Sequence, residues 1–178
     1  MINLELKTFI ENNIDLIEQC KFDTIYSIAL SDNIDVGDFT RTLLAANIDP
    51  LLNMSYVPSR YLFFGRLSDY TIPDGIDIIF PFAFTGNKFK TFVVPEGVSE
   101  IGREVFSHCL NLNSISLPKT LEFIDTKIFK NCVNLSEIIY NGSISEWNKI
   151  ECMTDAFYEI DSPAVHLVCT DYKGILTI

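Results

Sequence analysis

The sequence predicts an α+β chain: a short, mostly β solenoid preceded by a small α-helical cap. Two observations carry this prediction. Apolar residues recur at helical spacing in the first third of the chain, whereas the remainder repeats its own pattern every 22 or 23 residues. With 178 residues, 48% of them hydrophobic, the chain is long enough to bury a core. We therefore expect two regions, residues 1–66 and residues 67–178.

Residues 1–66 are expected to form three or four short helices. Asp38 precedes an apolar run and is the predicted N-cap of one of them. The Asp49–Pro50 pair should end that helix, because proline disfavours helical geometry in the residue before it. A repeat array needs its open end covered, so we interpret this region as a cap in preference to an independent binding domain. Apolar residues at helical spacing are Leu6, Phe9, Ile10, Ile14, Phe22, Ile25 and Ala29.

The second region contains five columns of residues that recur in one phase. Each unit has a short alternating stretch, a proline after it, a pair of apolar residues, and an aromatic residue near its end. Proline has no N–H for a sheet ladder and so ends each predicted strand. One such coil cannot bury its apolar face alone, whereas stacked coils can, and the repeat therefore predicts a solenoid. The columns are Pro73, Pro95 and Pro118; Ile76, Val98 and Leu121; Ile79, Ile101 and Ile124; Phe84, Phe106 and Phe129; and Phe89, Leu112 and Leu135.

The predicted strands lie in four stretches of seven residues with alternating apolar positions: 67–73, 89–95, 112–118 and 135–141. Their outward positions mix small polar side chains with two aliphatic ones. If the protein binds a partner, this row of strands is the first candidate surface. The candidate binding residues are Asp69, Thr71, Lys90, Val93, Asn113, Ser116, Glu137 and Ile139.

These repeats resemble the BspA-type leucine-rich repeat family. Residues 89–132 carry two good copies of its pattern, which end in Cys109 and Cys132, although Asp125 replaces the expected glycine. The first unit has Asn87 where the cysteine would fall. The resemblance covers about residues 67–171, counted as roughly three and a half repeats, and implies a leucine-rich repeat solenoid.

The resemblance also implies a binding role, since the family is usually described as mediating adhesion and protein binding, often from a secreted or surface position. This chain shows no apolar stretch near the roughly 20 residues that span a membrane. Glu5 and Glu11 lie where a signal peptide would be apolar. We therefore expect cytoplasmic residence, with recognition of a protein partner as the part of the family's role that transfers.

The acidic composition excludes several classes of partner. The net charge is −11, from 13 Lys and Arg against 24 Asp and Glu. A nucleic-acid binder needs a basic surface to neutralise phosphates, and an anionic membrane attracts basic segments. We expect neither of these partners. A protein with a basic face is the electrostatic complement, while the oligomeric state and the partner's identity are left open.

No residue pattern indicates catalysis, a cofactor or a metal site. The sequence has no H-E-x-x-H, C-x-x-C, phosphate-binding glycine loop or G-x-S-x-G. His108 is interpreted as a turn residue and His166 as an outward residue of a closing strand. A triad of Cys109, His166 and Asp171 could form only if folding brought the three together, and Cys109 occupies a repeat column. We therefore expect a protein that is not an enzyme.

The cysteines and the single tryptophan have structural interpretations. Cys109 and Cys132 lie in adjacent coils, where a disulfide is geometrically allowed. We prefer a ladder of reduced, buried thiols in a reducing compartment. Trp147 lies 23 residues after Ile124 and so continues the column of Ile79, Ile101 and Ile124. We interpret it as a bulky side chain that covers the last coil, with an exposed binding anchor as the alternative.

Two functions remain open. The first is a non-catalytic module in the cytoplasm that binds a protein partner with the strand face and the adjacent helices. The second is an acidic inhibitor, of the kind a phage would encode against host defence, that blocks a nucleic-acid enzyme by imitating its charged substrate. The second rests on the net charge of −11, but the acidic residues are dispersed along the chain and do not cluster.

Overall fold

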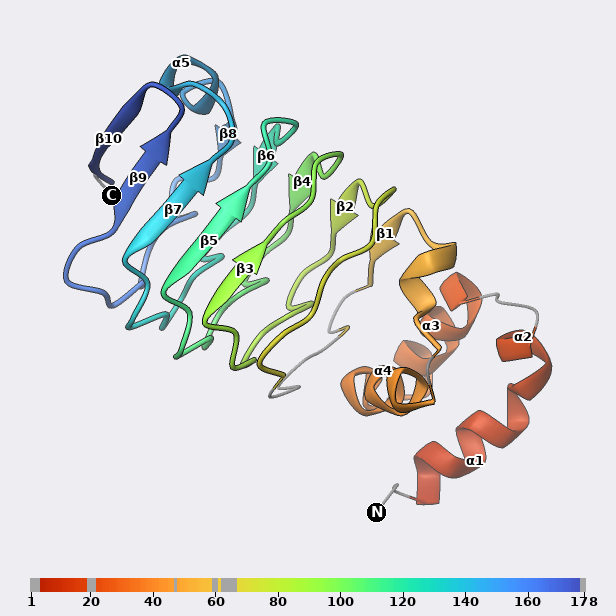
Figure 1. Ribbon diagram of the computed structural model, residues 1–178. Helices are drawn as coiled ribbons and strands as arrows, with labels where there is room; N and C mark the ends of the chain where they lie inside the picture. Colours follow the sequence, from red (N-terminus) through yellow and green to blue (C-terminus); the bar gives the residue numbers. More distant parts are fainter. Residues whose placement is uncertain (1–3, 19–21, 47, 59–60, 62–66, 177–178) are drawn as a thin grey trace.

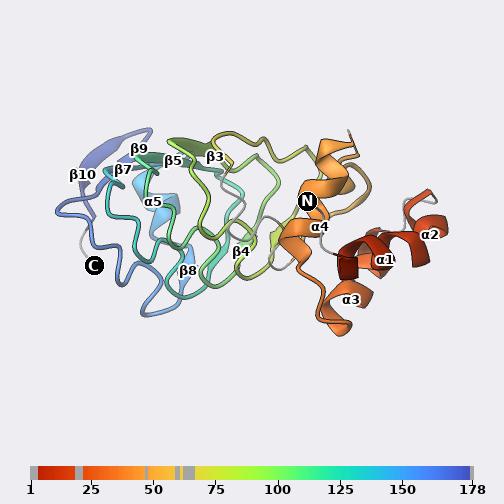
Figure 2. The ribbon, with the colours of Figure 1, turned by 90° about the horizontal axis from the view of Figure 1, so that it is seen from below.

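The structure is a computed structural model that describes residues 4–18, 22–46, 48–58, 61 and 67–176. Short helices lie at one end of a solenoid of stacked coils, and a β-hairpin lies at the other end (Figure 1). The view from below shows the same order, with the helices beyond the first coil (Figure 2). The expected combination of a mostly β solenoid and N-terminal helices is confirmed.

Four α-helices and one turn of 3-10 helix form the N-terminal region of the described chain. They are α1 (Leu4–Asn12), α2 (Ile14–Glu18), α3 (Phe22–Ser31), α4 (Val36–Ala45) and the 3-10 helix η1 (Pro50–Asn53). The Phe9 and Phe39 rings pack edge to face at 5.4 Å in their shared core. Asp35 caps α4, because its carboxylate accepts a hydrogen bond from the Asp38 amide. The predicted N-cap, Asp38, is therefore wrong and lies in the first turn.

The solenoid contains two five-stranded sheets. Sheet A is parallel throughout and consists, in spatial order, of β1 (Tyr56–Val57), β2 (Ile78–Ile79), β4 (Glu100–Ile101), β6 (Phe123–Ile124) and β8 (Glu151–Cys152). Sheet B consists of β3 (Thr91–Val93), β5 (Ser114–Leu117), β7 (Glu137–Tyr140), β9 (His166–Cys169) and β10 (Tyr172–Ile175). Only the last pair of sheet B, β9 and β10, is antiparallel. From β2 to β9 the chain alternates between the two sheets, so each coil stacks on the one before it.

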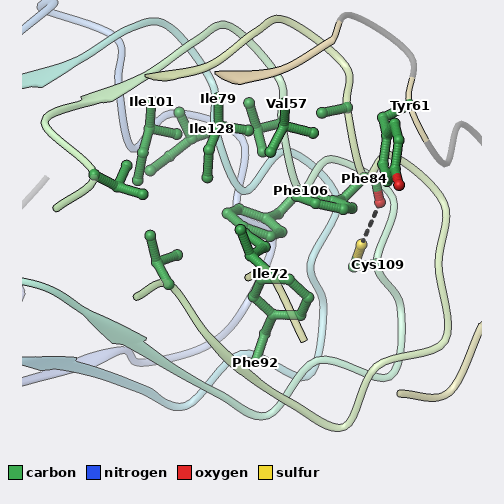
Figure 3. Close-up of a cluster of buried hydrophobic side chains, with 14 of the residues drawn as sticks. Val57, Tyr61, Ile72, Ile79, Phe84, Phe92, Ile101, Phe106, Cys109 and Ile128 are labelled. Carbon is green, nitrogen blue, oxygen red and sulfur yellow. Dashed lines mark hydrogen bonds between the residues drawn. The ribbon is translucent and has the colours of Figure 1, made fainter. Parts of the chain in front are cut away.

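The register of sheet A confirms one predicted column. Ile79 pairs with Ile101, and Ile101 pairs with Ile124, so equivalent residues lie one above another. All three side chains are buried in the core. Figure 3 shows Ile79 and Ile101 beside Val57 of β1. A repeat of 22 or 23 residues therefore corresponds to one turn of the solenoid.

The aromatic column is also confirmed. The rings of Phe84 and Phe106 stack with centroids 5.8 Å apart (Figure 3). Those of Phe106 and Phe129 stack with centroids 5.9 Å apart. The pile continues to Phe157 in the last coil, at 6.4 Å from Phe129. On the opposite side, the Tyr61 ring contacts Phe84 edge to face. The column therefore runs the length of the solenoid and is closed at its N-terminal end by a tyrosine.

The first predicted strand, residues 67–73, is wrong. These residues run beside β3 but form no ladder with it in the described structure, so sheet B ends at β3 (Figure 1). Sheet A, in contrast, begins earlier than the repeat spacing indicates, because β1 pairs with β2. One solenoid strand thus lies within residues 1–66, and the division at residue 67 stays a prediction.

The last coil departs from the repeat length because it contains an additional helix, α5 (Ile144–Trp147). The insertion places Phe157 28 residues after Phe129. Cys152, which pairs with Ile124, therefore takes the next place in the isoleucine column, and the assignment of Trp147 to that column is wrong. Trp147 instead packs against Tyr140 and Phe157, with centroids at 5.4 and 5.9 Å, and covers the last aromatic ring of the pile.

Asp49 connects the helical region to the solenoid. Its carboxylate accepts hydrogen bonds from the hydroxyls of Tyr61 at 3.0 Å and Tyr70 at 3.1 Å. The Tyr61 ring also contacts Tyr26 of α3, with centroids 5.9 Å apart. Burial raises the pKa of Tyr61 and Tyr70, so both hydroxyls stay protonated donors. Asp49, which was expected to end a helix, therefore fixes the first coil against the helices.

Candidate functional site

The outward side of sheet B is a regular surface made of two rows. Alternate side chains of a strand point to opposite faces, and the parallel register brings equivalent positions side by side. We call these two rows the strand face. They consist of Thr91, Ser114, Glu137 and His166, and of Val93, Ser116, Ile139 and Val168.

The structure brings four of the eight candidate residues together on the strand face: Val93, Ser116, Ile139 and Glu137. Val93 is 61% exposed, and the other three are half-buried. Lys90 and Asn113 are exposed at the positions just before β3 and β5. Asp69 and Thr71 are exposed in the segment beside β3 that forms no strand.

Charge on the strand face is largely compensated. The Glu137 carboxylate forms an ion pair with Lys173 of β10 at 3.1 Å. Ser116 donates to the Asn141 side chain, and the Asn141 amide donates to Glu96 at 3.1 Å. The acidic side chains at this surface therefore have partners within the protein. What the strand face presents to a partner is mostly short polar groups and aliphatic side chains.

Residues of β9 and β10 complete the strand face, and the sequence reasoning only partly found them. His166 was predicted to face outward from a closing strand, and its register beside Glu137 confirms that position. Val168 extends the other row, and Lys173 pairs with Val168 across the antiparallel hairpin. The repeat spacing gave no signal for β10, because this strand returns antiparallel after a tight turn.

A groove of about 610 Å³ lies at the β3 end of the strand face. Its lining consists of residues 68–71, Lys88, residues 90–93 and Asn111. Four of the candidate residues are among its lining: Asp69, Thr71, Lys90 and Val93. We refer to this feature as the edge groove.

The repeat region matches a known family. Residues 56–162 match the family described as "BspA type Leucine rich repeat region (6 copies)". The chain belongs to the BspA-type leucine-rich repeat family. The match begins at β1, before residue 67, where the sequence places the start of the resemblance.

Solved structures also include a protein similar to this BspA-type chain. It is a leucine rich cell surface protein from Faecalibacterium prausnitzii A2-165, with 30% sequence identity and a TM-score of 0.36. The similarity covers 43% of this chain and 23% of that protein. The search of curated proteins gave no match.

The BspA-type repeat cysteines are buried thiols that bind the preceding coil. The Cys109 thiol donates to the Phe84 carbonyl at 3.4 Å, and the Cys132 thiol donates to the Phe106 carbonyl at 3.1 Å (Figure 3 shows the first). Their burial and their equivalent hydrogen bonds confirm a ladder of buried cysteine side chains, while the reduced state in the cell stays a prediction. Burial raises the pKa of Cys109 to about 12 and also raises the pKa of Cys132. Cys20 lies outside the described residues.

Cys109 and Asp171, two members of the triad that only folding could have formed, have other partners in the structure. Cys109 is fully buried and donates to a backbone carbonyl, whereas the Asp171 carboxylate accepts from the Ile144 amide at 2.8 Å. His108 adopts a left-handed conformation, with φ of 58°, in the turn after Phe106, as expected for a turn residue. Among the described residues, no group of three or more His, Cys, Asp or Glu could hold a metal ion. Within the same residues, no helix is long and apolar enough to cross a membrane.

The difference between buried and exposed cysteines predicts a pattern of chemical modification. In the native protein at mildly alkaline pH, iodoacetamide should label Cys152 and leave Cys109 and Cys132 unmodified, because only the thiolate reacts. Partial desolvation raises the pKa of Cys152 too, but its side chain is exposed and the reagent can reach it. Peptide mass spectrometry measures the labelling. Labelling of Cys109 at the rate of Cys152 would contradict the buried ladder, and the denatured protein, in which all sites react, is the control.

Proposed function

We propose that this chain is a non-catalytic module that binds a protein partner in the cytoplasm, and that the strand face is the contact surface. Membership of the family supports a protein-binding repeat module. The observation that carries the finer proposal is the pair of regular rows on sheet B, which present aliphatic side chains beside short polar ones. Aliphatic side chains gain from burial in an interface, and the one central acid, Glu137, would not be buried unpaired, because it already has a cation partner in Lys173.

The strand face is too small to form a standard protein–protein interface alone. The four strands that carry its rows, at the usual spacing of about 4.8 Å, extend the strand face by about 14 Å. A standard interface buries about 800 Å² on each partner, which is more than rows this short supply. We propose that the helical region supplies the rest, since its exposed Leu4 and Ile14 offer additional apolar contact. The net charge of −11 favours a partner with a basic face.

The inhibitor that imitates a nucleic acid is the alternative function. It requires carboxylates that are free to replace phosphates, whereas Glu104, Glu137 and Glu159 are engaged in ion pairs within this chain. Binding that depends on charge imitation should weaken strongly as salt is raised, because salt screens exposed charges. A salt titration of partner binding separates the two functions. Loss of most of the affinity at high salt would favour the inhibitor.

The strand face is tested by a single charge placed at its centre. We expect Ile139→Arg to reduce partner recovery in affinity capture from native cytoplasm by about tenfold. The reason is that binding would then bury a charged side chain in the aliphatic row of the strand face. The measurement is quantitative mass spectrometry of the captured proteins. Val133→Arg is the matched control, because Val133 is an exposed aliphatic residue outside the two rows.

Two outcomes would contradict this proposal. Equal recovery with Ile139→Arg and with the parent protein would exclude the strand face as the contact surface. Recovery of the native protein from the medium or the cell envelope in a fractionation experiment would exclude action in the cytoplasm.

A further inference from the structure

Strand β3 is the edge strand of sheet B in the described part of the chain. It pairs with β5 on one side, and no strand pairs with it on the other among the described residues. Residues 68–71 run beside this edge, yet the described structure contains no backbone hydrogen bond between them and residues 91–93. In later coils the equivalent segments are joined by such bonds, as in Asn113 N–H to the Lys90 carbonyl at 2.8 Å.

The direction of the known hydrogen bonds shows which backbone groups of β3 are available. On the side of β5, the Lys90 carbonyl accepts from the Asn113 N–H at 2.8 Å, and the Val94 N–H donates to the Ser116 carbonyl at 2.9 Å. Because alternate residues of a strand direct their backbone groups to opposite sides, Thr91 and Val93 direct theirs away from β5. Each of these two residues therefore offers an N–H donor and a carbonyl acceptor to whatever lies along the edge.

The edge groove gives those backbone groups room for a ligand. Its volume of about 610 Å³ is within the range of about 300–1,000 Å³ that is usual for ligand sites, and Thr91, Phe92 and Val93 all line it. Tyr70, on the other side, is held by its hydrogen bond to Asp49. That bond fastens the segment of residues 68–71 to the helical region and not to β3.

The charge of the edge groove is opposite in sign to that of the whole chain. Lys88 and Lys90 both line it and are exposed, and neither is in an ion pair in the described structure. The lining includes a single acidic residue, Asp69. Two uncompensated cations beside an open strand edge are complementary to an extended segment that carries carboxylates.

We infer that the edge groove binds an extended acidic peptide segment, which pairs with β3 as an added strand. Backbone bonds to Thr91 and Val93 hold the peptide, and Lys88 and Lys90 select for glutamate or aspartate on it. The inference rests on the protein-binding function and names the segment of the partner that is recognised. At an ionic strength of about 0.15 M the Debye length is about 8 Å, so the net negative charge of the remainder of the chain is screened from the groove.

The test uses fluorescent peptides and the full chain. A short peptide of alternating valine and glutamate should bind, measured by fluorescence anisotropy at physiological salt, and the same peptide with lysine in place of glutamate should not. N-methylation of either all valines or all glutamates removes the N–H groups from one edge of the peptide strand. One of these two methylated peptides should lose binding and the other should keep it, because only one edge faces β3.

Charge reversal in the chain tests the role of the lysines. The double variant Lys88→Glu and Lys90→Glu should weaken binding of the valine–glutamate peptide by roughly tenfold, as expected when two exposed ion pairs become repulsive. The matched control is Lys119→Glu with Lys149→Glu, which changes the net charge equally at two exposed lysines outside the groove. The control should bind within about twofold of the parent. Thermal denaturation midpoints equal to the parent's show that each variant is folded.

Three results would overturn the inference: no binding of the valine–glutamate peptide, equal binding of the lysine peptide, or equal weakening in both double variants. Hydrogen exchange gives a further readout, because the amides of Thr91 and Val93 should become protected when the peptide binds. Unchanged exchange at both amides in the bound state would also overturn it. Ile139→Arg separates this site from the strand face: it should leave peptide binding intact, so either proposal can fail alone.

Discussion

Replacing Phe106 by alanine should lower the free energy of unfolding by about 3–5 kcal/mol. The Phe106 side chain is fully buried and stacks between Phe84 and Phe129, so its removal leaves a cavity with aromatic rings on both sides. It also contacts Phe92 of β3, with ring centroids 5.1 Å apart, and so joins the aromatic column to sheet B. The cost should be near the upper end of this range, because stacked coils cannot easily close a gap between them.

Urea denaturation followed by circular dichroism measures this effect. Leu110→Ala is the control, because Leu110 is four residues away in the same turn but 52% exposed, and should change the stability by less than about 0.5 kcal/mol. A midpoint for Phe106→Ala equal to that of the parent would mean that the aromatic column does not carry the stability of the solenoid.

Deleting residues 1–60 should convert the protein into an aggregating species. The deletion removes β1 and so opens the edge of β2 in sheet A, and it also removes Asp49 and the helices that cover the first coil. Tyr61 loses its ring contact with Tyr26, and its buried hydroxyl loses the Asp49 acceptor. An open strand edge and an exposed solenoid end are both sites of intermolecular association.

Size-exclusion chromatography of the purified truncation tests this expectation. A shorter deletion of residues 1–46 keeps η1, Asp49 and β1, and should aggregate less than the longer one because the β2 edge stays paired. A soluble, monomeric product from the longer deletion would contradict the interpretation of the helical region as a cap. It would make residues 1–60 a separate module.

The sequence predicted the interior of the solenoid because identical environments require similar residues. Phe84, Phe106 and Phe129 each fill the same place in successive coils, so their spacing shows the length of a turn. The thiol ladder follows for the same reason: each thiol donates to a phenylalanine carbonyl of the coil before it. The positions of Val93, Ser116 and Ile139 in one row could likewise be read from the repeat alone.

The same reasoning failed at both ends of the repeat. The pattern of residues 67–73 is that of a strand, but Tyr70 is bound by Asp49 of the helical region, and no ladder to β3 forms in the described structure. At the other end, α5 lengthens the last coil, so counting by a constant step assigned Trp147 to a column that Cys152 occupies. Neither the helical contact nor the inserted helix has a counterpart in the inner coils.

The sequence by itself determined that this protein is a stack of BspA-type coils, which residues face the core, and which side chains line the outer surface of the inner strands. Only the tertiary structure decided where the stack begins, how β10 and Trp147 close it, and that β3 is the last strand of sheet B among the described residues, beside Lys88 and Lys90. The physical reason is that an inner coil contacts copies of itself, whereas a terminal coil contacts residues outside the repeat. A periodic pattern contains information about the first kind of contact and none about the second.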